Sequence, residues 1–273
     1  MLAVVEDQGI GRYWSIVPAR FVFGLLLFAL ATVPGHVRAS AEEVSVWIYH
    51  NFPPFIVNIK QERGLSYDLA RLLTQKSDGQ FRFRAMVLPR QRLNQRLEAG
   101  HQGMVMWANP AWFDDATRTR FLWTDPILSD RNVVISPMEV AFEYDGPRSL
   151  TGMTMVGVRG HRYQDVDRLI DYDLVKRVDM RSERSLVQFI ASGRGRVAIV
   201  AQSAAQYFVQ ELGLRDAVHV SERPHSSYRR YIMVQPQQTE LYSFLLEAVP
   251  QLSESAEWAK ILERYGVVVA VTP

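Results

Sequence analysis

The chain has 273 residues, 48% of them hydrophobic and 22% charged, which is the composition of an ordinary globular protein. Its formal net charge is only +2 at pH 7, so the charge gives no indication of a nucleic-acid-binding protein. The absence of cysteine excludes disulfides, thiolate metal sites, cysteine nucleophiles and attachment through a lipidated cysteine.

The longest apolar run of the chain covers residues 21–33. It is about 13 residues long, fewer than the roughly 20 that cross a bilayer as a helix. Two arginines precede the run, a Pro-Gly pair ends it, and small-residue cleavage sites follow within residues 37–41. We interpret residues 1–41 as a secretory signal peptide that is removed, which predicts a free protein in a bacterial periplasm. The alternative is an uncleaved membrane anchor.

The stretch Tyr49–Asp68 reads as the end of a strand, a rigid aromatic loop and the beginning of a helix. Residues 44–48 alternate in hydrophobicity as a short strand does, and a Pro-Pro pair then stops the strand. Leucines at helical spacing from Leu65 onward predict the helix. The loop therefore presents Phe52 and Phe55 at the carboxyl end of a strand, where open α/β sheets bind ligands. The alternative is that both rings fill the core.

Strand-like and helix-like segments alternate over the rest of the chain. The predicted strands are 81–87, 103–107, 131–136, 154–158, 174–179, 196–200, 217–220 and 229–235. The predicted helices begin near Pro89 and Ser182 or cover 163–172, 202–212, 238–249 and 253–265. This alternation predicts an α/β protein with a parallel or mixed sheet between helices. Two sets of similar size predict two lobes, with a boundary in residues 137–147.

Several motifs, in this order, resemble those of the family 3 periplasmic solute-binding proteins, the receptors of polar-amino-acid ABC importers. They are Tyr-His-Asn-Phe-Pro-Pro-Phe at Tyr49–Phe55, Gly-Leu-Ser-Tyr-Asp from Gly64, Trp-Thr-Asp-Pro-Ile from Trp123, Leu-Thr-Gly-Met-Thr-Met-Val-Gly-Val from Leu150 and Ala-Ala-Gln-Tyr-Phe from Ala204. The resemblance covers the whole mature chain. It implies a two-lobed fold of the periplasmic-binding-protein type, with a ligand cleft between the lobes.

The resemblance also implies how the chain is divided and what it serves. Residues 42–136 and 235–273 would form a discontinuous lobe one, and residues 137–234 would form lobe two. The protein would be a monomer that delivers a small-molecule solute to an inner-membrane permease or sensor.

The amino-acid-binding pattern of that family is incomplete in this sequence. The family's carboxylate-binding arginine corresponds to Thr117, with Arg118 beside it. The Gly-Thr turn of the family reads Gly-His-Arg from Gly160, and its ammonium-binding Asp corresponds to Ala201. The resemblance therefore predicts the fold, whereas the ligand is predicted only as a small polar or anionic solute.

We expect the ligand to meet aromatic rings and an anion-binding turn. Arg159 and the glycine after it precede a helix, whose amino-terminal N–H groups favour an anion. Arg118 would supply charge from lobe one, unless it is simply solvated. The predicted ligand-binding residues are Tyr49, Asn51, Phe52, Phe55, Trp107, Arg118, Arg159, Tyr163 and Gln202. No catalytic residue, metal ion or cofactor is predicted.

The chain lacks the Gly-x-Ser-x-Gly, His-Glu-x-x-His and phosphate-loop motifs. We therefore expect binding without chemistry, in which the ligand bridges both lobes and stabilises a closed form. One alternative is an enzyme similar to prephenate or arogenate dehydratases, with Asp68 and Glu183 as candidate acid–base residues. Another is a stand-alone sensory module without a transporter.

Overall fold

The computed structural model describes Gly9 and residues 40–267. The predicted signal peptide lies outside the described residues, apart from Gly9 and its last two residues, and so do residues 268–273. Residues from Ser40 onward form a compact unit of their own. Within the described part of the chain, no helix is long and apolar enough to span a membrane.

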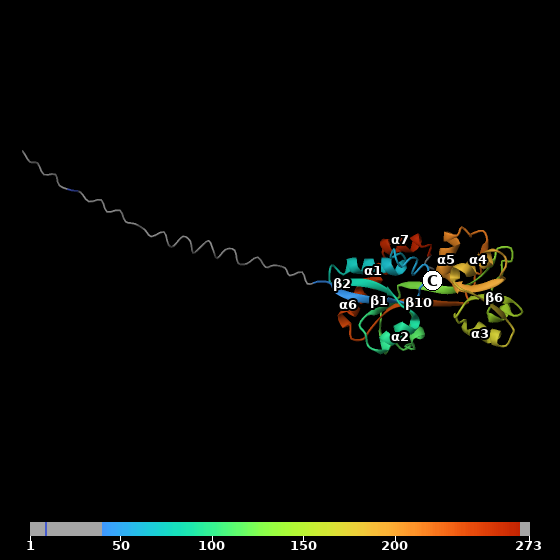
Figure 1. Cartoon of the computed structure of the whole chain (residues 1–273), viewed down its shortest axis with the longest axis horizontal. Coiled ribbons are helices and arrows are strands. Elements are labelled where there is room, and N and C mark those ends of the chain that lie inside the picture. Colours follow the sequence, from blue (N-terminus) through green and yellow to red (C-terminus); the bar gives the residue numbers. More distant parts are fainter. Residues whose placement is uncertain (1–8, 10–39, 268–273) are drawn as a thin grey trace, which may run out of the picture. The chain divides into compact units, whose positions relative to one another are not determined.

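The described residues contain one continuous mixed sheet (Figure 1). Its strands are β1 (Glu42–Ile48), β2 (Phe81–Val87), β3 (Met104–Ala108), β4 (Leu122–Trp123), β5 (Leu128–Pro137), β6 (Thr154–Val158), β7 (Lys176–Met180), β8 (Val197–Ala201), β9 (Val218–Val220) and β10 (Ser226–Val234). The strand order is β2-β1-β3-β10-β5-β8-β6-β7, with β4 beside β10 and β9 beside β5. β1 is parallel to β2 and β3, and β6 is parallel to β7 and β8. β5 and β10 run antiparallel to each other in the middle of the sheet.

Helices cover both faces of the sheet at each of its ends (Figure 1). They are α1 (Leu65–Lys76), α2 (Arg90–Glu98), α3 (Gln164–Asp171), α4 (Glu183–Ala191), α5 (Gln202–Glu211), α6 (Thr239–Ser253) and α7 (Ala256–Arg264), with short 3₁₀ helices η1 (Pro110–Phe113) and η2 (Pro147–Leu150). The α/β class and the mixed sheet flanked by helices are therefore confirmed.

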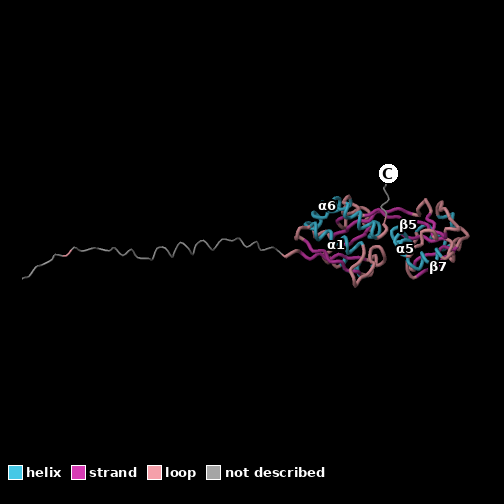
Figure 2. Tube along the Cα trace, turned by 90° about the horizontal axis from the view of Figure 1, so that it is seen from above, coloured by secondary structure: helices cyan, strands magenta, loops and turns pink. Residues whose placement is uncertain are grey.

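The hydrophobic core is divided between the two ends of the sheet, as two lobes require. One core cluster lies under α1, α6 and α7, and a second lies on the α2 side of the same strands. Alternation along β1 supplies both, because Val46 and Ile48 point into the first and Trp47 into the second. At the other end, α4 and α5 cover a third cluster and α3 a fourth. β5 and β10 connect the two ends, as the tube in Figure 2 also shows for β5. The division at residues 136 and 235 stays a prediction.

The aromatic loop and α1 meet at a glycine. Gly64 has a φ of +138°, and a Cβ at this position would lie 2.5 Å from the carbonyl oxygen of Phe55. This close approach lets the amide of Leu65 donate to Pro54 O at 2.9 Å and the amide of Ser66 donate to Phe55 O at 3.1 Å. The helix therefore begins directly against the loop that follows β1.

The two crossing strands are longer than the hydrophobic pattern predicts. β5 begins at Leu128 rather than at residue 131, and β10 begins at Ser226 rather than at residue 229. The additional residues are mostly polar, apart from Leu128, and they pair across the two strands, with Tyr228 opposite Asp130. Backbone pairing between β5 and β10 extends both strands here. Such pairing cannot be predicted from a pattern of apolar residues in the sequence.

Candidate functional site

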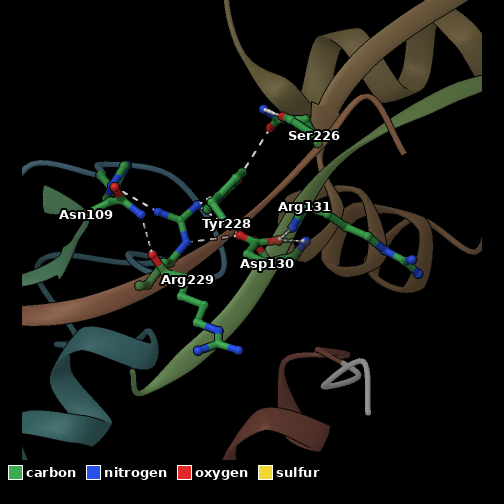
Figure 3. A network of polar contacts seen from close by, with 10 residues as sticks. Asn109, Asp130, Arg131, Ser226, Tyr228 and Arg229 are labelled. Carbon is green, nitrogen blue, oxygen red and sulfur yellow. Dashed lines mark hydrogen bonds and ion pairs between the residues drawn. The ribbon is translucent and has the colours of Figure 1, made fainter. Parts of the chain in front are cut away.

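A buried ion pair links the two crossing strands. Asp130 of β5 and Arg230 of β10 each have only 2% of the side chain exposed. The Nε and Nη2 atoms of Arg230 donate to Oδ2 of Asp130 at 3.0 and 2.9 Å. Nη2 also donates to the hydroxyl of Tyr228 at 3.2 Å. Figure 3 shows this network from close by, with Asp130 and Tyr228 facing each other across the strands.

The carboxylate of Asp130 also caps a helix of the second lobe. Its Oδ1 accepts the amide of Ser203, in the first turn of α5, at 3.2 Å and the amide of Arg131 at 2.9 Å. Its Oδ2 accepts the Ser203 hydroxyl at 2.8 Å. The negative charge therefore meets both the positive end of a helix and the guanidinium of Arg230.

Aromatic rings surround the guanidinium of Arg230. Its Cζ lies 4.5 Å from the ring centroid of Phe55, 5.0 Å from that of Tyr228 and 5.4 Å from that of Trp112. Cations are attracted to such ring faces, most strongly where water is excluded. We call His50, Phe55, Trp112, Asp130, Tyr228 and Arg230 the crossover cluster.

His50 completes the cluster from the end of β1. Its Nε2 lies 3.1 Å from Nη1 of Arg230. Because arginine can only donate, Nε2 must accept, which assigns a neutral imidazole with its proton on Nδ1. The ring also hydrogen-bonds to the backbone of Trp107. Burial, and then the nearby charge of Arg230, hold the pKa of His50 well below its ordinary value of 6.5.

The polar contacts continue along the crossing strands toward the second lobe (Figure 3). The hydroxyl of Tyr228 donates to Asn132 Oδ1 at 3.4 Å, and Asn132 Nδ2 donates to Ser226 Oγ at 3.0 Å. Ser226 Oγ lies 3.3 Å from Nδ1 of His225. From the first lobe, Asn109 Nδ2 donates to the carbonyl of Arg229 at 2.9 Å. The loop after β3 is thereby attached to β10.

On the second lobe, one arginine holds the turn that follows β6. Nη2 of Arg177 donates to the carbonyls of Val158 and His161 at 3.0 and 2.9 Å. Its Nε forms an ion pair with Asp179 at 2.7 Å. The side chain of His161 is largely exposed, but partial desolvation by the neighbouring protein, followed by the charge of Arg177, lowers its pKa. The turn is therefore fixed, while its tip is open to water.

Three predicted ligand-binding residues, Phe52, Gln202 and Arg159, lie near the crossover cluster or in the turn after β6. Phe52 is half-buried, and its ring meets those of His50 and Phe55 edge-on. Gln202 is half-buried at the beginning of α5, where its side-chain oxygen accepts from Nε of Arg131. Arg159 is exposed in the turn after β6.

Three other predicted ligand-binding residues, Phe55, Trp107 and Tyr163, are buried. Phe55 and Trp107 have no exposed surface. The indole N–H of Trp107 donates to Ser66 Oγ at 2.9 Å, and its ring stacks on Trp258 at a centroid distance of 6.2 Å. Tyr163 is also buried, which raises its pKa to about 12, and its hydroxyl accepts the amide of Val158 at 3.2 Å.

The last three predicted ligand-binding residues are Tyr49, Asn51 and Arg118. The ring of Tyr49 lies 4.0 Å from that of His50. Together with the exposed Asn51 it lines a separate cavity of about 620 Å³ between the loop after β1 and strand β2. The exposed Arg118 places its guanidinium 4.7 Å from the ring centroid of Tyr231.

Asp130, His50 and Arg230 were not among the predicted site residues. One signal was available, because Arg230 alternates in phase with Ile232 and Val234, which are both buried. A charge in that register must be buried and therefore needs a partner. No comparable signal identifies Asp130, since its partner is 100 residues away in the chain.

The two acid–base candidates of the enzyme alternative differ in their surroundings. Asp68 is buried, accepts from the Tyr265 hydroxyl at 2.8 Å and pairs with Arg71, so it joins α1 to α7. Glu183 lies half-buried in the first turn of α4, and burial raises its pKa.

Comparison with solved structures shows the fold. An ancestral arginine-binding protein bound to arginine aligns over 83% of this chain and 99% of its own, with a TM-score of 0.62 and 16% identity. The GluR0 ligand-binding core in complex with L-glutamate aligns over 84% of this chain and 99% of its own, with a TM-score of 0.63 and 15% identity. The periplasmic VFT2 domain of Bordetella pertussis BvgS aligns over 82% of this chain and 93% of its own, with a TM-score of 0.54 and 22% identity.

These neighbours share a two-lobed α/β architecture, so the predicted fold class is confirmed. No protein-family model matches the sequence, and a sequence search of curated proteins finds no relative.

Proposed function

We propose that this protein binds a small polar or anionic solute between its two lobes and that binding stabilises a closed form. The observation that supports this proposal is that the segments after β1 and β3 and the beginning of α5 all reach the crossover cluster, through His50, Trp112 and Ser203. Carboxyl ends of strands in open α/β sheets are where ligands bind. A solute placed there would touch both lobes, and its differential affinity would favour closure.

Two kinds of side chain are available to recognise the solute. Phe52 beside the crossover cluster and Trp112 and His50 within it are half-buried and offer ring faces. Arg159 and His161 are exposed in the turn that Arg177 holds, directly before α3. This combination suits a solute with a ring portion and an anionic group.

The structural neighbours support binding over chemistry. Two of them carry an amino acid, arginine in one and L-glutamate in the other. For the present chain, an amino-acid ligand stays open because the carboxylate-binding pattern is incomplete. A periplasmic location after removal of residues 1–41, and delivery to an importer permease or a sensor, complete the proposal. The BvgS domain, named as periplasmic, is consistent with either partner.

A thermal-shift screen tests this function. The purified protein is mixed with amino acids, polyamines, organic acids, sugars or aromatic acids. A solute at about 100 times its dissociation constant adds about 2.7 kcal/mol, which raises the unfolding midpoint by roughly 5–10 °C. We expect one class of compound to produce this shift, and Phe52→Ala and Arg159→Ala to weaken it.

Arg194→Ala is the matched control, since Arg194 is also exposed but precedes β8 at its amino-terminal end. The proposal is wrong if no compound shifts the midpoint, or if the Arg194 variant loses the response as much as the Arg159 variant does.

The raised pKa of Glu183 is the one observation that favours the enzyme alternative. Incubating the protein with prephenate and following phenylpyruvate absorbance separates the two functions. We expect no turnover. Turnover that disappears in Glu183→Gln would replace the binding proposal by a dehydratase.

A further inference from the structure

We infer that Asp130 supplies, from within the chain, the carboxylate that Arg230 and the beginning of α5 would otherwise take from a solute. Asp130 is then a specificity-determining residue, which selects solutes that bring no carboxylate to this place. The inference rests on the proposed function, since it concerns the same site between the lobes.

The donors around Asp130 are those that recognise a free carboxylate. Two come from one arginine fork, at 3.0 and 2.9 Å, and two from the amide and hydroxyl of Ser203 in the first helical turn, at 3.2 and 2.8 Å. The amide of Arg131 adds a fifth at 2.9 Å. A guanidinium fork together with a helix amino terminus is a strong carboxylate site in proteins. Here an internal side chain fills it.

The donors come from parts of the chain that a bridging solute would also touch. Arg230 belongs to a crossing strand and contacts His50 at the end of β1, whereas Ser203 belongs to α5 of the second lobe. Among the described residues, Arg230 is also the one arginine that is buried, and Asp130 balances its charge. The site therefore has its anion-binding position between the lobes, but that position is already occupied.

The occupied position limits the class of solute. A second carboxylate near Arg230 would meet the charge of Asp130 and find the guanidinium already engaged. The anionic group of a solute must then lie elsewhere, and the exposed Arg159 is the candidate. The ring portion keeps the faces of Phe52 and Trp112. The solute is thus an aromatic or ring compound whose charged group binds at the turn after β6.

Formate rescue of Asp130→Ala tests the inference without knowledge of the solute. Formate is a carboxylate small enough for the space that the substitution leaves. We expect the variant to unfold roughly 10 °C below the native protein in chloride, since one partner of a buried pair is lost. Formate at equal ionic strength should raise the variant's midpoint by several degrees, and leave that of the native protein within about 1 °C of its chloride value.

Two variants serve as controls. The double variant with Asp130→Ala and Arg230→Met lacks the guanidinium of Arg230, and formate should not change its unfolding midpoint. Asp115→Ala removes another buried carboxylate, which accepts three amides and the Trp123 indole N–H but contacts no guanidinium within the described part of the chain, and this variant should respond less to formate.

An equal formate response in the native protein or the double variant contradicts the inference, as does no response in Asp130→Ala. If Asp130→Ala does not fold in chloride, circular dichroism in formate gives the same test. Folding restored by formate supports the inference, and an unfolded chain in both salts contradicts it. A solute screen that fails while formate rescue succeeds would overturn the proposed function and the role of Asp130 in selecting solutes, but would support the carboxylate position itself.

Discussion

Arg230 illustrates how a charged residue can be part of a hydrophobic strand. Its neighbours on the same face are Ile232 and Val234, and its guanidinium is bonded to Asp130, Tyr228 and His50. A buried ion pair of this kind adds little net stability compared with apolar residues of the same size. Breaking it is costly, however, because the remaining charge stays buried without its partner.

We therefore predict that Arg230→Met lowers the free energy of unfolding by about 3–5 kcal/mol, because Asp130 loses its counter-charge. Arg229→Met is the matched control, since the adjacent side chain is exposed. It should change the free energy by less than about 0.5 kcal/mol. Urea unfolding followed by circular dichroism measures both. Similar midpoints for the two variants would show that Asp130 does not depend on Arg230 as its counter-charge.

A second residue-scale prediction concerns pH and His50. Its pKa is lowered in the folded protein, so below its ordinary value of 6.5 the unfolded chain binds a proton that the folded protein does not. This contribution to stability is present above that pH and is lost as the pH falls. Between about pH 7.5 and pH 5.5 the loss from this residue should approach roughly 1 kcal/mol.

The comparison with His50→Gln isolates this effect, because glutamine keeps an acceptor for Arg230 without titrating. His161 and His225 also have lowered pKa values, but both proteins retain them, so their contributions cancel. Urea midpoints at the two pH values are the measurement. An equally steep loss of stability in the variant would mean that His50 is protonated in the folded state.

At the scale of elements, the junction between the aromatic loop and α1 depends on Gly64. We predict that Gly64→Ala destabilises the protein by about 2–4 kcal/mol, because a Cβ would overlap the backbone of Phe55 and the φ is strained as well. Gly100→Ala has the strained φ of +68° but open space, and should cost only about 1 kcal/mol. Thermal unfolding of both variants gives the comparison, and equal losses would exclude the close approach as the cause.

Elements with a strong local signal could be predicted from the sequence. Ser182 caps α4 as expected, β6 has the predicted bounds, and the leucines of α1 are buried. Local signals could not predict where β5 and β10 begin, because only pairing between distant strands makes these largely polar segments regular. The pairing of Asp130 with Arg230 in the crossover cluster escaped prediction for the same reason. Of the predicted site residues, Phe52 was accessible to a sequence argument because its proline-stiffened loop is local.

At the scale of the whole molecule, the lobes are in contact beside the crossing strands. Phe52 of the first lobe and Tyr207 of α5 each pack against two core clusters, one in each lobe. Arg131 and Gln202 make a further contact at the end of β8. The residues proposed to meet the solute are thus next to the contacts that must change when the lobes move. This placement is what solute-dependent closure requires.

Hydrogen–deuterium exchange with and without a pooled solute library tests directly whether a solute binds between the lobes. The pool contains amino acids, polyamines, organic acids, sugars and aromatic acids. We expect exchange to slow at the same time in residues 49–55 of the first lobe and in residues 159–163 and 202–204 of the second. Helix α6, away from the site, should not change. Unchanged exchange with every pool, or protection of the segments of one lobe alone, would contradict solute binding between the lobes.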